Sequence, residues 1–465
     1  MLQRMQSVPL FDHLKTTAAI AACIYRYLEE IGFEYSVKSN AERFLLIQGD
    51  LSGLQRFIFS THHSTASRVG ASRRLRGRSL YLKLIMDSVA HTLLERLSLP
   101  LANLLWNTGG HLLILSPNTS SARGAVDQTR GEVQRWLLEE YDGELYLNLA
   151  YLPVSDEGLN LKKSKATLQE LINQEKDRRF KGDLKHLFTS MGEVISQREQ
   201  CVACGKPGEQ VDGERVLCEE CLQHEELGRA LAKAEYLVRS KKPVRHLRGV
   251  KILHAYYYLC SEGELGTASL EDASLLRLNR SDNRLYTKYP DLSHSFCFLA
   301  KTVPLIAGDV LSFSELAQLS RGAQRLGVLK MDVDNLGAVF SGKLQNESLS
   351  KYHTLSRMLE TFFTGYLNEL CEEFYVYPGE GLCRECIDNA KERRIETRVE
   401  SEEGDIVREY FRLTRDEVCE NCAPNRLTLP YVVYAGGDDT LIAAPLGCSG
   451  QTCPSHTGRL QKVLM

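Results

Sequence analysis

LPYVVYAGGDDTLIAA, residues 429–444, is the stretch on which the fold assignment depends. Two apolar runs that favour β-strands flank Gly436, Gly437, Asp438 and Asp439. A glycine pair between such runs is typical of a tight hairpin, because glycine adopts the positive φ that the turn requires. Aspartate is common in solvated turns, so one interpretation is a surface hairpin without chemistry. The other interpretation is a hairpin that presents two carboxylates to a ligand.

Length and composition predict a cytoplasmic protein of several domains. The 465 residues suggest roughly two to four domains. The net charge of −3 argues against a globally basic nucleic-acid binder, so any polyanion contact is expected to be local. The first 15 residues contain no apolar signal core, and the run AAIAACIY is too short to cross a bilayer, so no membrane association is expected. The 14 cysteines are expected to be reduced, and those in CxxC pairs are read as metal ligands.

The hairpin motif occurs twice in the chain. Residues 102–117, ANLLWNTGGHLLILSP, repeat it with His111 and Leu112 aligned to Asp438 and Asp439. Upstream of each hairpin, GDLSGLQRFIFS at 49–60 matches GVLKMDVDNLGAVFS at 327–341, which aligns Asp50 with Asp332. Helical patterns at 76–97 and 348–370 lie between strand and hairpin in the two copies. The sequence therefore predicts a duplicated strand, helix and hairpin unit.

This unit fits the first half of a ferredoxin-like palm, and residues 144–155 supply a plausible last strand for the first copy. We expect an α+β protein with two palm domains, of the nucleotide-cyclase or polymerase type, separated by a zinc ribbon. The expected organisation begins with an N-terminal helical segment at 1–40, which contains an amphipathic helix at 12–31, and a first, degenerate palm at 41–195. A zinc-ribbon and helical domain at 196–245 and a linker region of unclear fold at 246–320 follow. The chain then continues with a second palm at 321–447, which carries an inserted Cys-rich module at 380–424, and an irregular tail at 448–465.

Two sets of four cysteines have the spacing of zinc ligands. The first has the pattern C-x2-C-x13-C-x2-C, which is typical of a structural zinc ribbon with no open coordination position. A redox dithiol and incidental spacing are the alternatives. The second set encloses a charged spacer that is wider than usual, so one or two structural Zn2+ ions are expected. The predicted ligands are Cys201, Cys204, Cys218 and Cys221 in the first set, and Cys383, Cys386, Cys419 and Cys422 in the second.

Four aspartates could form a carboxylate cage. Asp332 and Asp334 are two residues apart in a predicted strand, so both project from one face. In a palm this strand lies beside the hairpin, where Asp438 or Asp439 could complete a site for two Mg2+ or Mn2+ ions. Such ions activate a 3′-hydroxyl and orient a nucleoside triphosphate.

The residues predicted to be catalytic are Asp332, Asp438 and Asp439. One of Asp438 and Asp439 is expected to bind metal directly, and the other is expected to act on the metal site without being a direct ligand. Gly436 and Gly437 would let the backbone approach a phosphate or a base closely. The alternative for Asp332 is a cap at the end of its strand.

Two further charged groups have structural alternatives. Asp12 and His13 are adjacent, but the order His-Asp that a metal-dependent phosphohydrolase needs occurs nowhere, so a capping or packing role is expected. A basic run precedes the first predicted helix, where an RNA or phosphate contact and a solvated loop are both possible. The run consists of Arg68, Arg73, Arg74, Arg76 and Arg78.

At this point the chain resembles a known family, the large palm-domain (GGDD) subunit of type III CRISPR effector complexes, most closely the III-A form. The resemblance is carried by LFDHLKTTAAIAA, GDLSGLQRFIFS, RLRGRSLYLKLIMD, the first cysteine set, FSELAQLSRGAQRLGVLKMDVDNLGAVFSG and YAGGDDTLIAAP. It implies conversion of ATP to cyclic oligoadenylates when a guide CRISPR RNA complex binds target RNA. It also implies partner subunits, a GGDD pair at Asp438 and Asp439, and Asp332 as the first-strand metal ligand.

The chain also departs from that family. Many members begin with an HD nuclease domain, and no match to it is found here, so DNA cleavage is not expected. After Pro445 the family continues with more of the palm and a helical domain, whereas residues 447–465 lack such periodicity, which suggests a fragment or an altered reading frame. The second cysteine set is not typical of the family. The competing hypotheses are a diguanylate-cyclase-like palm and a catalytically incomplete scaffold that binds guide RNA and neighbouring subunits.

Overall fold

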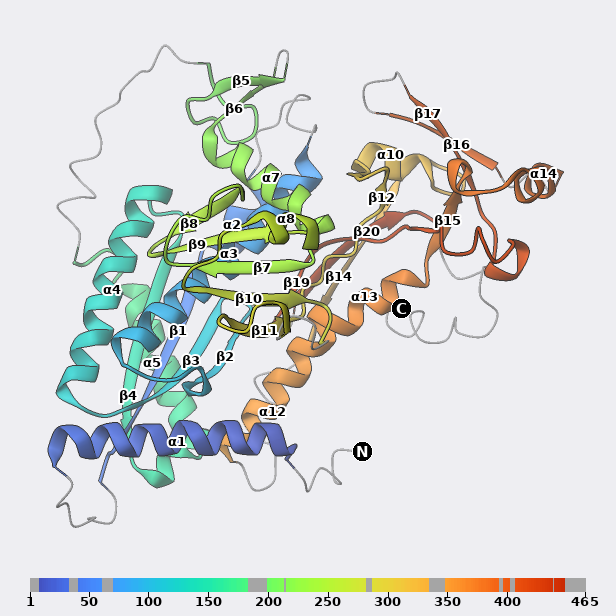
Figure 1. Ribbon diagram of the computed structural model, residues 1–465. Helices are drawn as coiled ribbons and strands as arrows, with labels where there is room; N and C mark the ends of the chain where they lie inside the picture. The colour runs from blue at the N-terminus through green and yellow to red at the C-terminus, as the bar shows by residue number, and fades with distance from the viewer. Residues whose placement is uncertain are drawn as a thin grey trace.

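The computed structural model describes residues 8–32, 41–60, 70–182, 199–212, 215–281, 287–333, 348–392, 396–401, 406–437 and 439–447. The fold is mixed α+β, with several separate sheets rather than one large one (Figure 1). Asp334 and Asp438 lie outside the described residues. No helix within the described ranges has the length and apolar character needed to span a membrane.

The first sheet has the connectivity predicted from the repeat. Its strands run in the order β2-β3-β1-β4 and every neighbouring pair is antiparallel. Helices follow β1 and β3, which gives the β-α-β-β-α-β order of a ferredoxin-like domain. The elements are β1 (Phe44–Ser52), α2 (Leu54–Phe59), α3 (Ala71–Arg96), β2 (Leu104–Thr108), β3 (His111–Pro117), α4 (Ser120–Tyr141), β4 (Tyr146–Val154) and α5 (Leu161–Asp177).

The second sheet repeats three of these four strands. Its order is β14-β20-β19, which corresponds to β1-β3-β2, and all neighbours are antiparallel. On its other side β1 pairs with β4, whereas β14 has no partner there within the described residues. The elements are β14 (Leu326–Asp332), α12 (Leu349–Glu360), a π-helical turn (Thr361–Tyr366), α13 (Leu367–Glu372), β19 (Tyr431–Gly436) and β20 (Asp439–Pro445).

The strand registers correct the alignment of the two hairpins by one residue. Thr108 pairs with His111 in the first hairpin, and Gly436 pairs with Asp439 in the second. The alignment of the two glycine pairs was therefore wrong, and His111 occupies the position of Asp439. Both glycines of the first pair have positive φ and form the turn, whereas Gly436 is still part of a strand. Hairpin register follows the turn residues, so a shift of one position changes every pairing.

A five-stranded sheet occupies much of the region for which no fold was predicted. Its order is β11-β10-β7-β9-β8, and the Tyr-rich run at 256–259, expected to be a strand, lies in β9. Because β7 pairs with β9 and β10, this sheet crosses the boundary expected at residue 245. The elements are β7 (Tyr236–Ser240), β8 (Gly249–Ile252), β9 (Ala255–Cys260), α8 (Glu262–Thr267), β10 (Ala273–Leu278), β11 (Ser293–Cys297), β12 (Leu305–Ile306), β13 (Asp309–Val310) and α10 (Phe313–Gln318).

The first cysteine segment joins the first sheet through two helices in close contact. It consists of β5 (Glu209–Asp212), β6 (Arg215–Leu217) and α7 (Glu219–Lys233), and α7 packs along α3. A Cβ on Gly77 of α3 would lie 1.7 Å from the carbonyl oxygen of His224, so only glycine fits there. This contact holds the first cysteine segment on α3.

The basic run lies largely inside this contact rather than on the surface. Arg74, Arg76 and Arg78 are only 2%, 1% and 4% exposed. Arg74 donates to Glu225 at 3.0 Å, and Arg78 donates to the carbonyl of Ser60 at 2.6 Å. For these three residues the predicted RNA contact and the solvated loop are both wrong, because their charges are paired or hydrogen-bonded in the protein interior. Arg68 lies outside the described residues.

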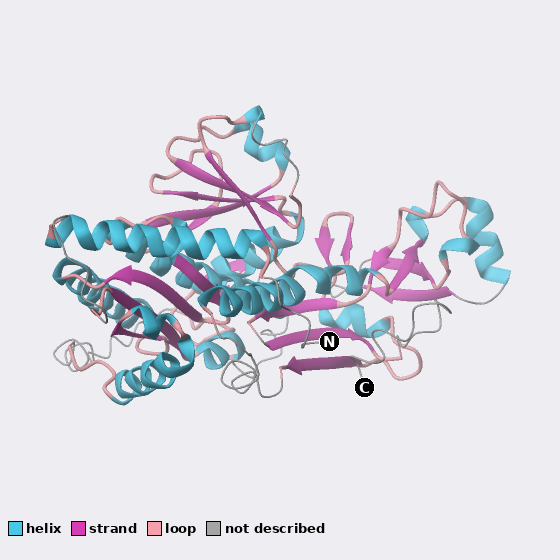
Figure 2. Cartoon of the chain, turned by 90° about the horizontal axis from the view of Figure 1, so that it is seen from below, coloured by secondary structure: helices cyan, strands magenta, loops and turns pink. Residues whose placement is uncertain are grey.

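The second cysteine segment shares a sheet with the second half of the chain. The order β16-β17-β15-β18 joins strands inside the expected module at 380–424 to strands on both sides of it. Figures 1 and 2 show this part at one end of the molecule. The elements are β15 (Tyr375–Pro378), α14 (Arg384–Glu392), β16 (Glu396–Glu400), β17 (Val407–Phe411) and β18 (Leu427–Thr428).

Helix α1 (Leu10–Ile31) ends at Gly32, as predicted, and contacts both β3 and α12. Asp12 is completely buried and accepts hydrogen bonds from Thr354 at 3.0 Å and from Arg357 Nε at 2.7 Å. The predicted packing role of Asp12 is confirmed, and it ties the N-terminal helix to the helix of the second unit. A buried carboxylate needs such partners to remain charged.

Candidate active site and metal centres

The tips of the two glycine hairpins touch each other. The Gly437 amide donates a hydrogen bond to Thr108 Oγ1 at 2.9 Å. A Cβ built on Gly437 would lie 3.0 Å from the Cα of Gly109, so a larger residue would push the tips apart. Gly436 has open space around it. The close backbone approach expected at the glycines therefore occurs between the hairpins, while an approach of phosphate or base stays a prediction.

Two of the four predicted carboxylates are brought together. Asp332 of β14 pairs directly with Asp439 of β20. Residues paired in this way project from the same face of a sheet, and like charges in such a pair are destabilising. Two adjacent carboxylates at the end of a strand pair are a suitable place for a cation. The contributions of Asp334 and Asp438 fall outside the described residues and stay predictions.

Asp439 has one oxygen with partners and one without. Its Oδ2 accepts a hydrogen bond from the Tyr434 hydroxyl at 2.8 Å and lies 3.7 Å from Lys330 Nζ. Its Oδ1 is buried and has no hydrogen-bond partner in the described part of the chain. A buried carboxylate oxygen without a donor is costly. A hard divalent cation, which prefers carboxylate oxygens, fits this donor set.

Tyr434 and Lys330 are site residues that the sequence analysis missed. Burial raises the pKa of Tyr434 well above its usual value, and the carboxylates of Asp439 and Asp332 raise it further, so the phenol stays protonated and donates. Lys330 lies two residues before Asp332 on the same strand face, and period-2 spacing could have identified it. The strand register shifts between Val432 and Tyr434, so simple alternation along the strand does not predict the position of Tyr434.

A cleft of about 290 Å3 opens beside Asp439. It lies between the two hairpins and the helices of the first unit, α2 and α3. Its lining is mostly apolar, with a few polar groups, which is typical of sites for small molecules. The polar side chains include Gln55, Ser79, Lys83, Asn107 and Asp439. Lys83 is held by Glu360 at 3.5 Å, so both halves of the chain contribute to the charge balance near this cleft.

A second cleft, of about 280 Å3, lies on the other side of the hairpin contact. His111, Gly109 and Gly437 line it, together with residues of α5 and α12. Residues of both hairpins therefore line each cleft, together with α2 and α3 in the first cleft and α5 and α12 in the second.

The first unit has a different set of charges at the matching position. Asp50 pairs with His111 in the β1–β3 ladder, as Asp332 pairs with Asp439. His111 Nδ1 lies 3.6 Å from Asp50 Oδ1, and the Lys176 ammonium forms an ion pair with Asp50 Oδ2. A protein cation thus lies at the single carboxylate of the first unit.

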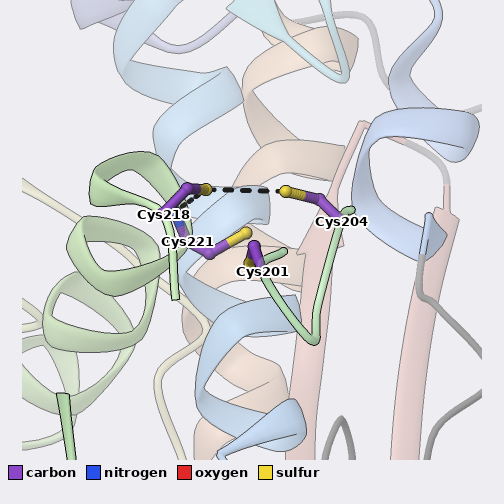
Figure 3. A group of neighbouring side chains, drawn as sticks. All are labelled: Cys201, Cys204, Cys218 and Cys221. Carbon is purple, nitrogen blue, oxygen red and sulfur yellow. Dashed lines mark hydrogen bonds between the residues drawn. The ribbon is translucent and has the colours of Figure 1, made fainter. Parts of the chain in front are cut away.

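The first cysteine set converges on one point (Figure 3). The four Sγ atoms all lie within 4.8 Å of one another, with Cys204 and Cys218 at 3.5 Å. Tetrahedral Zn2+ with four thiolates needs sulfur separations of about 3.8 Å. Backbone amides of Ala203 and Cys221 donate to Cys201 and Cys218 Sγ, each at 3.4 Å, which suits thiolate acceptors. The predicted ligand set therefore has the geometry of a zinc site.

The second set also converges despite its long spacer. Its four Sγ atoms again lie within 4.8 Å of one another. The spacer contains the β16–β17 hairpin, which returns the chain to the second cysteine pair. Cys383 and Cys419 are exposed, with their sulfurs 3.9 Å apart, whereas Cys386 and Cys422 are buried. Both clusters are consistent with zinc sites, and the second is the more accessible to solvent.

Family models match two parts of the chain. Residues 43–192 match the Csm1 subunit domain B, and residues 325–454 match the second palm domain of Cas10/Cmr2. The first match covers the four-stranded sheet, and the second covers the hairpin with Asp439.

Curated relatives are 27% to 32% identical to this chain over the aligned region, which is about half of each relative. The chain is 32% identical to the subtype III-A CRISPR system single-strand-specific deoxyribonuclease Cas10/Csm1 of Thermococcus onnurineus, over 80% of this chain and 47% of the relative. It is 27% identical to the Methanocaldococcus jannaschii protein of the same description, over 94% of this chain and 56% of the relative.

Solved structures of Csm1–Csm4 cassettes match the fold of almost the whole chain. A Csm1–Csm4 cassette in complex with one ATP matches with a TM-score of 0.66 and 27% identity, over 95% of this chain and 51% of that chain. The cassette in complex with cA4 matches with a TM-score of 0.63 and 26% identity, over 94% of this chain and 50% of that chain. The chain spans about half the length of the curated relatives that it matches, and it is a homologue of the Cas10/Csm1 large subunits of subtype III-A.

Proposed function

We propose that the chain is a nucleotidyltransferase that converts ATP to cyclic oligoadenylate as a subunit of a type III CRISPR RNA-guided antiviral complex. The observation that carries this proposal is the pair Asp332 and Asp439, which lie opposite each other in the strand ladder. Asp439 is at the wall of a cleft, and its buried Oδ1 has no hydrogen-bond partner in the described residues. This pair lies in the segment that matches the second palm domain.

The carboxylates would hold two Mg2+ or Mn2+ ions, with Asp334 and Asp438 as further ligands from the sequence prediction. Such ions, when bound, activate a 3′-hydroxyl and balance the charge of the triphosphate. Tyr434 holds Asp439 in place through its hydrogen bond, and Lys330 offsets part of the negative charge. Catalysis of this kind depends on positioning and charge stabilisation more than on covalent chemistry.

The two clefts suit two nucleotides that must meet. They lie on either side of the contact between Gly109 and Gly437, so nucleotides in both would approach at the hairpin tips. Lys83 is a candidate for a phosphate contact in the cleft beside Asp439. Related cassettes solved with ATP, with pppApA and with cA4 support a nucleotide site of this type.

The proposed partners are guide CRISPR RNA, target RNA and other subunits of the complex, in the cytoplasm. Related Csm1 chains were solved with Csm4, which supports a partner subunit of that kind. The finer architecture that we propose is a first palm without catalysis, a zinc ribbon, and a second catalytic palm. Zinc at both cysteine sets would have a structural role, because four thiolates leave no open coordination position.

One observation favours a scaffold as the second candidate function. The outer edge of β14 has no partner strand in the described residues, and Val328 on this strand is 66% exposed. The strand that carries Asp332 is therefore less supported than β1, which is almost fully buried. A weakly supported carboxylate positions metal less well.

The test is product formation by the reconstituted complex with ATP, Mg2+ and target RNA. Mass spectrometry should detect cyclic oligoadenylate only when target RNA is present, and the double variant Asp332→Asn/Asp439→Asn should give none. If the wild-type complex assembles on guide RNA and binds target RNA but forms no oligoadenylate, the chain is a scaffold and the enzymatic proposal fails.

A further inference from the structure

The segment 239–251, RSKKPVRHLRGVK, is strongly basic, although the chain as a whole is slightly acidic. It contains Arg239, Lys241, Lys242, Arg245, Arg248 and Lys251 with no aspartate or glutamate, whereas the whole chain has a net charge of −3. Local basic segments of this kind are the electrostatic footprint of polyanion contacts. The arginines buried between α3 and α7 do not belong to this segment, so it is a separate feature.

Most of these cations point to solvent. The segment begins at the end of β7, forms the loop between β7 and β8, and continues into β8, which is the edge strand of the five-stranded sheet. Arg248 is 94% exposed and lies 3.7 Å from Glu226, and Lys241 is 60% exposed and lies 3.0 Å from Glu95. Exposed ion pairs contribute little stability, so both cations can exchange these partners for phosphates. Arg245 is exposed as well.

The loop itself is held on the sheet. Val244 is buried, and its amide donates a hydrogen bond to the Tyr258 hydroxyl at 2.8 Å. The Lys251 ammonium lies 5.9 Å from the centre of the Tyr256 ring, which fixes this cation at the sheet edge through a cation–π contact. An anchored loop loses less conformational freedom on binding than a disordered one, which favours affinity.

We propose that Arg245, Arg248 and Lys251 form a binding surface for the phosphate backbone of RNA. Arginine binds phosphate in a bidentate manner, and Lys251 adds a point charge on the edge strand β8. The choice of RNA rests on the proposed place in an RNA-guided complex, while the surface itself follows from the charges and the fold. This surface belongs to the five-stranded sheet and is not part of the lining of either cleft at the hairpins.

The test is fluorescence anisotropy with the full chain and a labelled single-stranded RNA, without ATP, at several salt concentrations. The triple variant Arg245→Ala/Arg248→Ala/Lys251→Ala should bind RNA about tenfold more weakly than the wild type at low salt. The slope of log Kd against log salt concentration should be smaller by about 2, because about 0.7 of a counterion is released for each of the three phosphate contacts. The matched control is Arg384→Ala/Lys391→Ala/Arg398→Ala, three exposed cations in the second cysteine segment, which should bind as the wild type does.

Unchanged affinity and salt dependence in the first variant would overturn the proposal, as would an equal loss in the control. A DNA strand of the same sequence that bound more tightly than RNA would also contradict it. Thermal melting checks that both variants remain folded. Because no ATP is present, the outcome is independent of oligoadenylate synthesis, so failure of this surface and failure of the proposed enzyme are separate results.

Discussion

The two halves of the molecule place the same hairpin in different chemical surroundings. In the first half Asp50 lies opposite His111 and is paired with Lys176, and in the second half Asp332 lies opposite Asp439. The three-stranded ladders β2-β3-β1 and β19-β20-β14 correspond residue for residue, so at these two positions the difference is in the side chains. The Lys176 ammonium forms an ion pair with the single carboxylate of the first half, whereas in the second half Lys330 lies 3.7 Å from one of two paired carboxylates. One fold thus provides a supporting half and a half suited to a metal ion.

The support around the two halves also differs. Strand β1 is buried almost throughout, while β14 alternates between partly buried and exposed residues. The first cysteine set is largely buried between ribbon and helix, and the second has two exposed cysteines. We infer that stability is concentrated in the first half and reactivity in the second.

The largest expected effect is on the rate of ATP conversion, and it distinguishes Asp439 from His111, the equivalent residue of the first hairpin. Asp439→Asn should lower the rate of ATP conversion by the complex by about a hundredfold or more, the scale seen when a charge-stabilising group is removed. His111→Asn at the matching position should change the rate much less, because no metal-binding pair is present there. Equal losses in the two variants, measured with saturating ATP, would show that the halves do not differ in this way.

The cysteine sets should respond differently to substitution. Cys218→Ser should remove one zinc and unfold the ribbon, because a structural zinc site of this type contributes about 10–16 kcal/mol of apparent binding free energy. Cys419→Ser should remove the other zinc and leave the melting of the first half unchanged. Zinc analysis of the wild type should give about two ions per chain, and a value of one would refute the second site.

Tyr434→Phe should have an intermediate effect. The variant removes the hydroxyl that donates to Asp439 Oδ2 and keeps the ring. Loss of a group that orients a metal ligand costs about 10-fold or somewhat more in metal affinity. The check is the Mg2+ concentration that gives half-maximal activity, which should rise. The control is Tyr151→Phe in β4 of the first half, where the Arg130 guanidinium lies 5.9 Å from the centre of the Tyr151 ring. This variant should leave the Mg2+ concentration unchanged.

The smallest expected effect is on stability in the first half. Asp50→Asn should lower the free energy of unfolding by about 1–2 kcal/mol, because it leaves the Lys176 ammonium without its partner at a partly exposed position. Product formation at a temperature where the variant is folded should be close to that of the wild type. Thermal unfolding followed by circular dichroism measures the first effect. A loss of activity without a loss of stability would assign Asp50 a role in catalysis instead.

Several features were predictable because they depend on local sequence. The hairpins, the helix between strand and hairpin, and the two cysteine sets follow from glycine pairs, periodicity and spacing. The one-residue offset between His111 and Asp439 was not predictable from the glycine pairs, because the same dipeptide forms the turn in one hairpin and spans strand and turn in the other. Burial of Arg76 depends on carbonyl groups of Gly228 and Lys301, which are far away in the sequence.

The five-stranded sheet was missed for a related reason. Strands β10 and β11 are parallel neighbours, and β7 pairs with both β9 and β10, so no short hairpin signal identifies the whole sheet. The contacts of Tyr434 and Lys330 with Asp439 depend on a strand irregularity and on a neighbouring strand. Such non-local pairings are set by tertiary packing rather than by propensity.

The most direct measurement is Mn2+ binding to the full chain by electron paramagnetic resonance, in the absence of nucleotide. The wild type and Asp50→Asn should bind Mn2+ with similar affinity, while Asp332→Asn and Asp439→Asn should each lose most of the binding. If Asp439→Asn binds Mn2+ as the wild type does, or if Asp50→Asn is the variant that loses it, then the metal site does not lie between Asp332 and Asp439.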